Sequence, residues 1–257
     1  PEIHVSYMKL GITNPNPDVL IFLENTAQMT QKAQQLKLAS LGRLTASIAH
    51  EIRNPLGAIS HASQLLIESD NIIGADKRLL TIIEQHCIRV NSIVEKVLQL
   101  SRRQKSSPEL LDLPAWMQGF IQEYLSASNN KQILLDARDD IAIRFDPDQL
   151  YQVVNNMVSN GLYYSHKNNN DSVKILIGID ALNGLPYIEV HDFGPGVELE
   201  QQKNLFEPFY TTEKTGTGLG LYLSRELCEA NQAHLDYLPQ EHGACFRVTF
   251  SHPNRLI

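Results

Sequence analysis

The feature that most constrains this chain is a run of apolar residues over 75–103 that recur in alternating steps of four and three. This spacing places them on one stripe of an α-helix. The segment 30–69 carries a second stripe, and only the short loop 71–74 separates the two. The sequence therefore predicts an antiparallel helical hairpin. The stripes comprise Leu38, Leu41, Ile48, Ile52, Ile59, Ala62 and Leu66 in the first helix, and Leu79, Ile83, His86, Val90, Ile93, Val97 and Leu100 in the second.

The two apolar stripes need a second copy of the chain to cover them. One hairpin cannot bury both stripes well, whereas two hairpins can do so as a four-helix bundle. We therefore expect a homodimer. His86 lies on the second stripe and is interpreted as a packed polar residue of the bundle, without a chemical role.

A second, mixed domain follows the hairpin. Serines and prolines in 105–114 are typical of a linker, and after them helical and strand patterns alternate. Asp146 and Pro147 are a typical helix start, with Asp at the N-cap and Pro in the first turn. The order predicts an α+β sandwich rather than repeated βαβ units. Predicted helices span 116–127, 146–164 and 219–231, and predicted strands span 133–137, 141–145, 173–180, 187–193, 233–238 and 244–250.

The first residues predict a fragment of a further domain. Two strand patterns, 3–10 and 19–24, flank the turn sequence at 14–17. A lone hairpin is not stable in water, so we expect these strands to belong to a domain that begins upstream. Their arrangement resembles the end of a PAS sensor domain. The expected organisation is therefore a sensor remnant at 1–28, the helical hairpin at 29–104, a linker at 105–114 and a mixed domain at 115–257.

Composition excludes several classes of function. The 257 residues carry a formal net charge of −7, which argues against binding of nucleic acid. No apolar stretch is long enough to span a bilayer and no signal peptide is visible, so we expect a cytoplasmic fragment without membrane contact. The chain begins at Pro1, which is compatible with a membrane anchor upstream. Cys87, Cys228 and Cys245 form no CxxC pair, so we expect buried thiols rather than a zinc site or disulfides.

A histidine in the first helix is the candidate for covalent chemistry. His50 is two residues from both Ile48 and Ile52, so it faces away from the stripe and towards water. A solvent-facing imidazole can accept a phosphoryl group, and the adjacent Glu51 can orient or deprotonate it. Asn54 lies one turn further on the same face. A surface histidine without a role is the competing interpretation of His50 alone.

Three further motifs are suited to a nucleotide. Asn156 and Asn160 share one helix face, and their amides can bind Mg²⁺ or phosphate. Asp192 ends a strand and can accept a hydrogen bond from an adenine amino group, although a simple turn is the alternative. Alternating glycines that open a helix expose N–H groups to phosphates. The glycines of the two Gly-rich motifs are Gly194 and Gly196, then Gly216, Gly218 and Gly220.

Together and in this order, the motifs resemble those of the sensor histidine kinase family over about residues 36–252. His50 to Pro55 looks like its H box, Asn156 to Asn160 its N box and Asp192 to Gly196 its first glycine box. Phe206 to Phe209 looks like its F box and Gly216 to Gly220 its second glycine box. Within the family the sequence looks most like the nitrogen-regulation and pilus-regulation sensors.

The resemblance implies a fold and a mechanism. The fold is α+β multidomain: a dimeric helical hairpin, then an ATP-binding sandwich of the histidine kinase and chaperone ATPase type. ATP would phosphorylate His50 with Glu51 as base, and an aspartate of a response regulator would receive the phosphoryl group. Asn160 would hold Mg²⁺ and Asp192 would bind adenine. Asn54 would position water to dephosphorylate the partner.

Some positions depart from the family pattern. Phe193 stands where Asn is usual and Gly161 where Ala is usual, while Tyr163 replaces a common basic residue. A kinase-silent or phosphatase-dominant sensor is therefore the alternative function, and an ATPase of the chaperone type is a third. Lys214, in the expected lid at 195–216, is our preferred substitute for the basic residue; the other candidates are Lys167 and Lys203.

Overall fold

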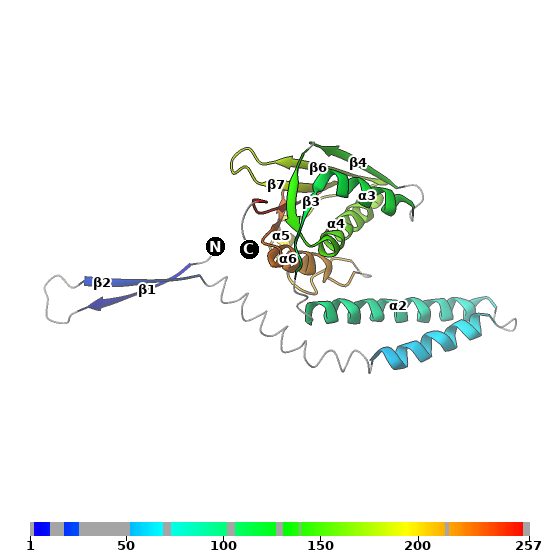
Figure 1. Cartoon of the computed structure of the whole chain (residues 1–257). Helices are drawn as coiled ribbons and strands as arrows, with labels where there is room; N and C mark the ends of the chain where they lie inside the picture. The colour runs from blue at the N-terminus through cyan, green and yellow to red at the C-terminus, as the bar shows by residue number, and fades with distance from the viewer. Residues whose placement is uncertain are drawn as a thin grey trace. The chain divides into compact units, whose positions relative to one another are not determined.

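The computed structural model describes residues 3–10, 18–25, 52–68, 73–101, 106–126, 131–138, 140–213 and 216–253. The chain divides into two compact units, Pro1–Arg103 and Gln104–Ile257 (Figure 1). His50, Glu51 and Lys214 lie outside the described residues.

The first unit opens with the predicted strand pair. β1 (Ile3–Leu10) runs antiparallel to β2 (Asp18–Asn25), with Ile3 opposite Asn25 and Leu10 opposite Asp18. The two expected strands are thus confirmed, and Figure 1 shows them as a two-stranded ribbon. The predicted turn at 14–17 lies outside the described residues.

Two helices form the hairpin of the first unit. One covers 52–67 and the other, α2, covers Ala75–Ser101. Two contacts fix their antiparallel sense. Arg53 Nη2 lies 3.6 Å from Glu95 Oε1, and Gln64 Nε2 donates to Glu84 Oε1 over 3.0 Å. The hairpin expected from the periodicity is therefore present.

The stripes expected to lie in the bundle core are not the ones that a single hairpin buries. Cys87, Val94 and Leu98 of α2 are buried within the chain. Leu79, by contrast, is 58% exposed and Ile59 is 48% exposed. His86, expected to pack in the bundle, is also exposed in the single chain. Within one chain, the two helices pack through residues adjacent to the predicted stripes. Many of the stripe residues that the structure describes therefore stay exposed.

The second unit is a five-stranded sheet with helices on one face. The strand order is β4-β6-β7-β9-β8, in which β4 is parallel to β6 and the other pairs are antiparallel. The predicted strands and helices are confirmed to within three residues at each end. The strands are β4 (Gln132–Ala137), β6 (Ser172–Ile179), β7 (Pro186–Asp192), β8 (His234–Leu238) and β9 (Cys245–Thr249), and the helices are α3 (Leu113–Ser126), α4 (Pro147–Lys167), the short α5 (Leu199–Gln202) and α6 (Gly220–Ala230).

Alternation along the strands gives the sheet two different faces. Successive side chains of a strand point to opposite faces. Ile188 and Val190 of β7 lie in the core with Phe246 and Val248 of β9, against apolar residues of α3 and α4. Burial of these side chains is the main stabilising term of the unit, at about 25 cal/mol per Å² of apolar surface. The opposite face carries polar and charged residues of the same strands.

The segment predicted as a linker contains a strand. Glu109–Asp112 forms β3, which pairs antiparallel with β5 (Ala142–Phe145), and α3 begins directly after it. Only Leu111 of β3 is half-buried, so the segment lacks the apolar alternation that identifies a strand. The prolines and serines that suggested a linker lie around this strand.

The start of α4 follows the prediction. The Asp146 carboxylate accepts hydrogen bonds from the N–H groups of Asp148 and Gln149, each over 3.1 Å, and caps the helix. Its other oxygen accepts from Ser107 N over 2.9 Å. The cap therefore also binds the chain that precedes β3.

Asn231, at the end of α6, connects three segments. Its Oδ1 accepts from Asp146 N over 2.9 Å and from the Ser106 hydroxyl. Its Nδ2 donates to Gln149 Oε1 over 2.7 Å and to the Leu227 carbonyl over 2.8 Å. This buried amide joins the end of α6 to the start of α4 and to the segment at 106–107.

Candidate functional site

Asp192 lies at the end of β7 and faces the helices. It is only 7% exposed, and its Oδ1 accepts hydrogen bonds from Gly194 N and Ala244 N, each over 2.9 Å. Its Oδ2 has no hydrogen bond to the residues that the structure describes. Burial raises the pKa of this carboxyl, against the opposing effect of the two N–H donors and of His191. The site thus holds a fixed carboxylate oxygen as a free acceptor.

Glycines allow the backbone to close around Asp192. A Cβ on Gly161 of α4 would lie 2.8 Å from Val173 Cγ1 and 3.5 Å from Asp192 Cβ. A Cβ on Gly243, which has φ of +72°, would collide with the Asp192 carbonyl oxygen. Gly194 meets Tyr164 in the same way, with a Cβ 2.9 Å from that of the tyrosine. A Cβ at Gly243 or Gly194 would therefore press on Asp192, whereas at Gly161 it would press on the Val173 side chain.

The two asparagines of α4 have different surroundings. Asn156 Nδ2 donates to Ser224 Oγ of α6 over 3.0 Å, and a Cβ on Gly220 would collide with Asn156 Oδ1. Asn160, one turn further, is half-buried and makes no side-chain hydrogen bond to the described residues. Asn156 therefore joins α4 to α6, whereas Asn160 keeps its amide for another partner.

The second Gly-rich motif forms the start of α6. Gly218 has φ of +66° and its carbonyl accepts from Phe209 N over 2.9 Å, which packs the loop against the predicted F box. Leu219, at the N-cap, provides no side-chain hydrogen bond to the helix. The first N–H groups of α6 therefore lack a side-chain cap, a property of helix ends that bind anions.

The end of the predicted lid is held by α4. Tyr163 Oη donates to Glu213 Oε2 over 2.7 Å, and Lys167 Nζ donates to Glu213 Oε1 over 2.5 Å. The hydrogen bond from Lys167 lowers the pKa of Glu213, and the same bond raises the pKa of Lys167. Tyr163, which stands where the family pattern has a basic residue, thus hydrogen-bonds to Glu213 of the predicted lid.

Phe193 is anchored through its backbone. Its N–H donates to Ser165 Oγ and its carbonyl accepts from Asn168 Nδ2, each over 2.9 Å. The side chain is 37% exposed. The main chain beside Asp192 is therefore held by hydrogen bonds that do not involve the aromatic ring.

The structure brings most of the predicted nucleotide residues together on α4, the end of β7 and the start of α6. Asn54 is exposed on the helix over 52–67 in the first unit. Sequence reasoning missed Gly243 and Ser224. Gly243 precedes a strand and gave only a turn signal, and Ser224 lies on the buried face of α6 among apolar residues. The gathered residues are Asn156, Asn160, Asp192, Gly194, Gly196, Gly216, Gly218 and Gly220.

Two family models match the chain. One, described as His Kinase A (phospho-acceptor) domain, matches residues 40–106. The other, described as Histidine kinase-, DNA gyrase B-, and HSP90-like ATPase, matches residues 145–254.

Curated relatives match along the chain. It is 52% identical to Sensor protein kinase PilS of Pseudomonas aeruginosa, over 100% of this chain and 49% of that protein. It is 30% identical to Signal transduction histidine-protein kinase AtoS of Escherichia coli, over 84% of this chain and 36% of that protein. The chain therefore spans half or less of the length of these relatives.

Solved structures share the fold. Full-length ShkA in complex with AMPPNP has a TM-score of 0.64 at 20% identity, over 82% of this chain and 47% of that chain. Histidine kinase ThkA in complex with response regulator protein TrrA has a TM-score of 0.63 at 20% identity, over 99% of this chain and 76% of that chain.

Among the described residues, no helix has both the length and the apolar character needed to cross a membrane.

Proposed function

Since this chain belongs to the sensor histidine kinases, we propose that it uses ATP to phosphorylate His50 and transfers that phosphoryl group to an aspartate of a response regulator. The observation that carries the proposal is the geometry of Asp192. A buried carboxylate with one oxygen fixed by two N–H groups and the other free is suited to accept a hydrogen bond from the adenine amino group.

The phosphates of ATP would lie between α4 and the start of α6. The uncapped N–H groups after Leu219 provide donors at a positive helix end. Gly216, Gly218 and Gly220 would let the backbone approach the phosphates. Lys214 stays our candidate for a further phosphate contact from the lid, although it lies outside the described residues.

Asn160 is our candidate ligand for Mg²⁺. Its half-buried amide is without a partner among the described residues, and an amide oxygen is a hard donor that suits this ion. Bound Mg²⁺ would neutralise charge on the phosphate oxygens. Asn156 would support this position, because its hydrogen bond to Ser224 holds α4 against α6 beside it.

His50 would act as the phosphoryl acceptor. The neutral imidazole would attack the γ-phosphorus, the bond from that phosphorus to the β–γ bridging oxygen would break and ADP would leave, with Glu51 taking or orienting the ring proton. Asn54, one turn along the same helix face, is exposed, which supports a solvent-facing His50. Asn54 would position water when the partner is dephosphorylated.

We also propose that the chain acts as a homodimer and docks a response regulator on the helix face around His50. Uncovered apolar side chains on both helices of the hairpin support the dimer. ThkA, which shares the fold, has been solved in complex with a response regulator protein, and this supports the choice of partner. The remaining domain assignments, including the PAS-like remnant at 1–28, are part of the same proposal.

Incubation with γ-labelled ATP tests the proposed function. We expect acid-labile label on the wild type, none on His50→Ala, and transfer of the label to a receiver domain. Label that persists in His50→Ala would contradict the assignment. Strong dephosphorylation of the regulator with little self-labelling would instead support a phosphatase-dominant sensor, which the matches to a phospho-acceptor domain and an ATPase domain do not favour.

A further inference from the structure

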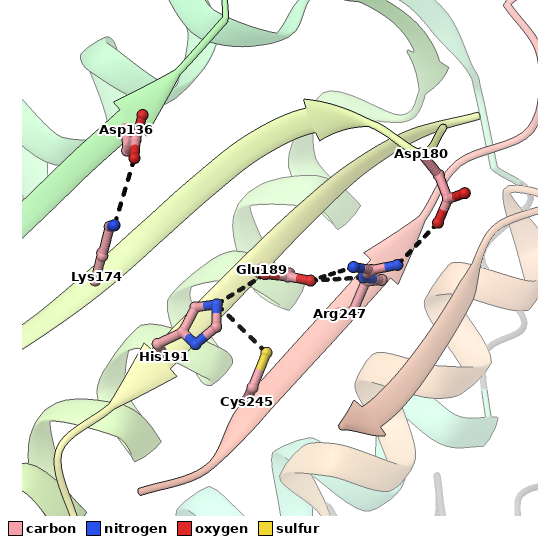
Figure 2. Close-up of polar contacts among 7 residues, drawn as sticks. All are labelled: Asp136, Lys174, Asp180, Glu189, His191, Cys245 and Arg247. Atoms are coloured by element: carbon pink, nitrogen blue, oxygen red, sulfur yellow. Dashed lines mark hydrogen bonds and ion pairs between the residues drawn. The ribbon is translucent and has the colours of Figure 1, made fainter. Parts of the chain in front are cut away.

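Three side chains with metal-binding atoms converge on the outer face of the sheet. Glu189 and His191 are two residues apart on β7, and Cys245 of β9 stands directly opposite His191. His191 Nε2 lies 2.8 Å from Glu189 Oε2 and 3.6 Å from Cys245 Sγ. All three atoms lie within 4.8 Å of one another, and Figure 2 shows the side chains pointing together.

This cluster is separate from the proposed nucleotide site. Side chains alternate between the two faces of a strand, so Glu189 and His191 point away from the face to which Ile188, Val190 and Asp192 belong. The core packs on that other face, together with α4. A ligand at Glu189, His191 and Cys245 would therefore leave the adenine pocket unobstructed.

The cluster is enclosed, unlike a chance group of surface residues. Cys245 is fully buried, and the side chains of Glu189 and His191 are 8% and 24% exposed. A thiol with no exposed surface is inaccessible to oxidants in the solvent. This environment argues against a redox-sensing cysteine, whereas a metal ion can replace the thiol proton.

Arg247 fixes the carboxylate of the cluster. Its Nε lies 2.7 Å and its Nη2 2.5 Å from Glu189 Oε1, which leaves Oε2 turned towards His191. Its Nη1 lies 3.1 Å from Asp180, so a second carboxylate also balances the guanidinium charge. Partners of this kind orient the ligands of metal sites.

We propose that Glu189, His191 and Cys245 form a binding site for a divalent transition-metal ion such as Zn²⁺. The donor set of carboxylate oxygen, imidazole nitrogen and thiolate sulfur suits a borderline ion and not Mg²⁺. Tetrahedral coordination with these ligands separates the donor atoms by on the order of 3.5 Å. The His191–Cys245 distance already fits, and the Glu189–His191 contact would open by about 0.7 Å. Water would occupy the fourth position.

Co²⁺ is the probe that tests the site, because thiolate coordination gives a charge-transfer band in the near ultraviolet. The untagged, reduced, metal-free chain is titrated with Co²⁺ and then with Zn²⁺. We expect a band at one equivalent of Co²⁺ that Zn²⁺ removes. Cys245→Ser should abolish the band, and His191→Ala and Glu189→Gln should each weaken binding by at least about tenfold.

Two variants serve as matched controls. His234→Ala removes a histidine from the same face of neighbouring β8, and Cys87→Ser removes a buried thiol from the first unit. Both should bind Co²⁺ like the wild type. Zn²⁺ should raise the Tm of the wild type but not that of His191→Ala, which tests the site even if Cys245→Ser fails to fold.

Three results would contradict the proposed metal site. Absence of the band in the wild type would leave the cluster as a closed set of hydrogen bonds without a metal function. A band that survives in Cys245→Ser, or that disappears in Cys87→Ser, would assign the ion to another cysteine. None of these results bears on His50 phosphorylation, so the proposed function is tested independently.

Discussion

Asp192 lies in an environment that disfavours its charged form. Its raised pKa means that the folded state holds the acid proton more tightly than the unfolded chain does. The stability that this carboxyl contributes is therefore greatest below 3.8, the pKa of the group in the unfolded chain, and is lost as the pH rises through its pKa in the folded state. A carboxylate kept at this cost in stability is typical of a residue retained for binding.

Asp192→Asn separates binding from stability. The asparagine Oδ1 can still accept from Gly194 N and Ala244 N, while an amide Nδ2 takes the place of Oδ2 and, as a donor, repels the adenine amino group. We expect ATP affinity in calorimetry to fall by roughly 10- to 100-fold. The Tm at neutral pH should be equal or higher, and the loss of stability above about pH 4 should be smaller. Unchanged ATP affinity would remove Asp192 from the adenine site.

Gly243→Ala tests the close approach to Asp192. Gly184 provides a matched control, because it has φ of +70° but no atom within 4 Å of the position that a Cβ would take, while Gly243 has φ of +72° and faces the Asp192 carbonyl. We expect a cost of about 1 kcal/mol for Gly184→Ala and about 3 kcal/mol or more for Gly243→Ala. Urea denaturation measures both. Equal losses would mean that only backbone conformation matters at Gly243.

Residues of the candidate site could be predicted from the sequence where they belong to a local motif. Asp192 and the glycines at 216–220 stood in recognisable short patterns. Gly243 and the Glu189, His191 and Cys245 cluster did not, because their roles depend on the register between β7 and β9. Cys245 and His191 are 54 positions apart in sequence. The expectation of no zinc site was based on CxxC spacing, which a cross-strand site does not need.

Among the elements, α4 connects the most parts of the site. It carries both asparagines, Gly161 against Asp192, and the two side chains that hold Glu213. Its start was predictable from Asp146 and Pro147, because capping is a local interaction. β3 was not predictable, since its four residues are held by pairing with β5 and only one is half-buried.

The cap of α4 should contribute measurably to stability. Asp146→Ala removes hydrogen bonds to Asp148 N, Gln149 N and Ser107 N. We expect a loss of about 1–2 kcal/mol in the free energy of unfolding, and Asp146→Asn should recover most of it. Chemical denaturation monitored at Trp116, which packs in the core of this unit, reports the change. A neutral Asp146→Ala would show that water replaces the cap.

The lid contact of α4 should compete with nucleotide. Glu213→Gln removes the ion pair with Lys167, which frees this ammonium for the phosphates. We expect ATP affinity to rise by about two- to threefold, a size typical of exposed ion pairs, and to fall in Lys167→Ala. Glu200→Gln in α5 is the control and should have no effect. A fall in affinity with Glu213→Gln would mean that Glu213 itself contacts the nucleotide.

At the scale of the whole molecule, the exposed apolar side chains of the hairpin are the surface through which we propose that two chains assemble. The periodicity predicted the two helices and their apolar faces. It could not identify which face of each helix packs inside one hairpin, because more than one face carries apolar residues at helical spacing. The structure resolves this point: Val94 and Leu98 are buried within the chain, whereas Leu79 and Ile59 are exposed.

Leu79→Lys tests assembly through this exposed face. The chain mass is 29.0 kDa, and we expect the wild type to scatter light as a particle of twice that mass. A lysine in the bundle core should weaken the dimer by at least about tenfold and give monomer at micromolar concentration. Leu182→Lys changes a leucine that is 98% exposed in the second unit and should stay dimeric. A dimeric Leu79→Lys would place the interface elsewhere.

The Asn231 amide ties the beginning of the second unit to its helices. Ser106 donates to Asn231 and Ser107 N donates to Asp146, so the chain is already held to this unit before β3 begins. Tension on the incoming chain would reach the start of α4 and the end of α6 at the same buried point. We therefore expect the helix that carries the asparagines and the helix whose N–H groups are proposed to bind phosphate to respond to such tension together.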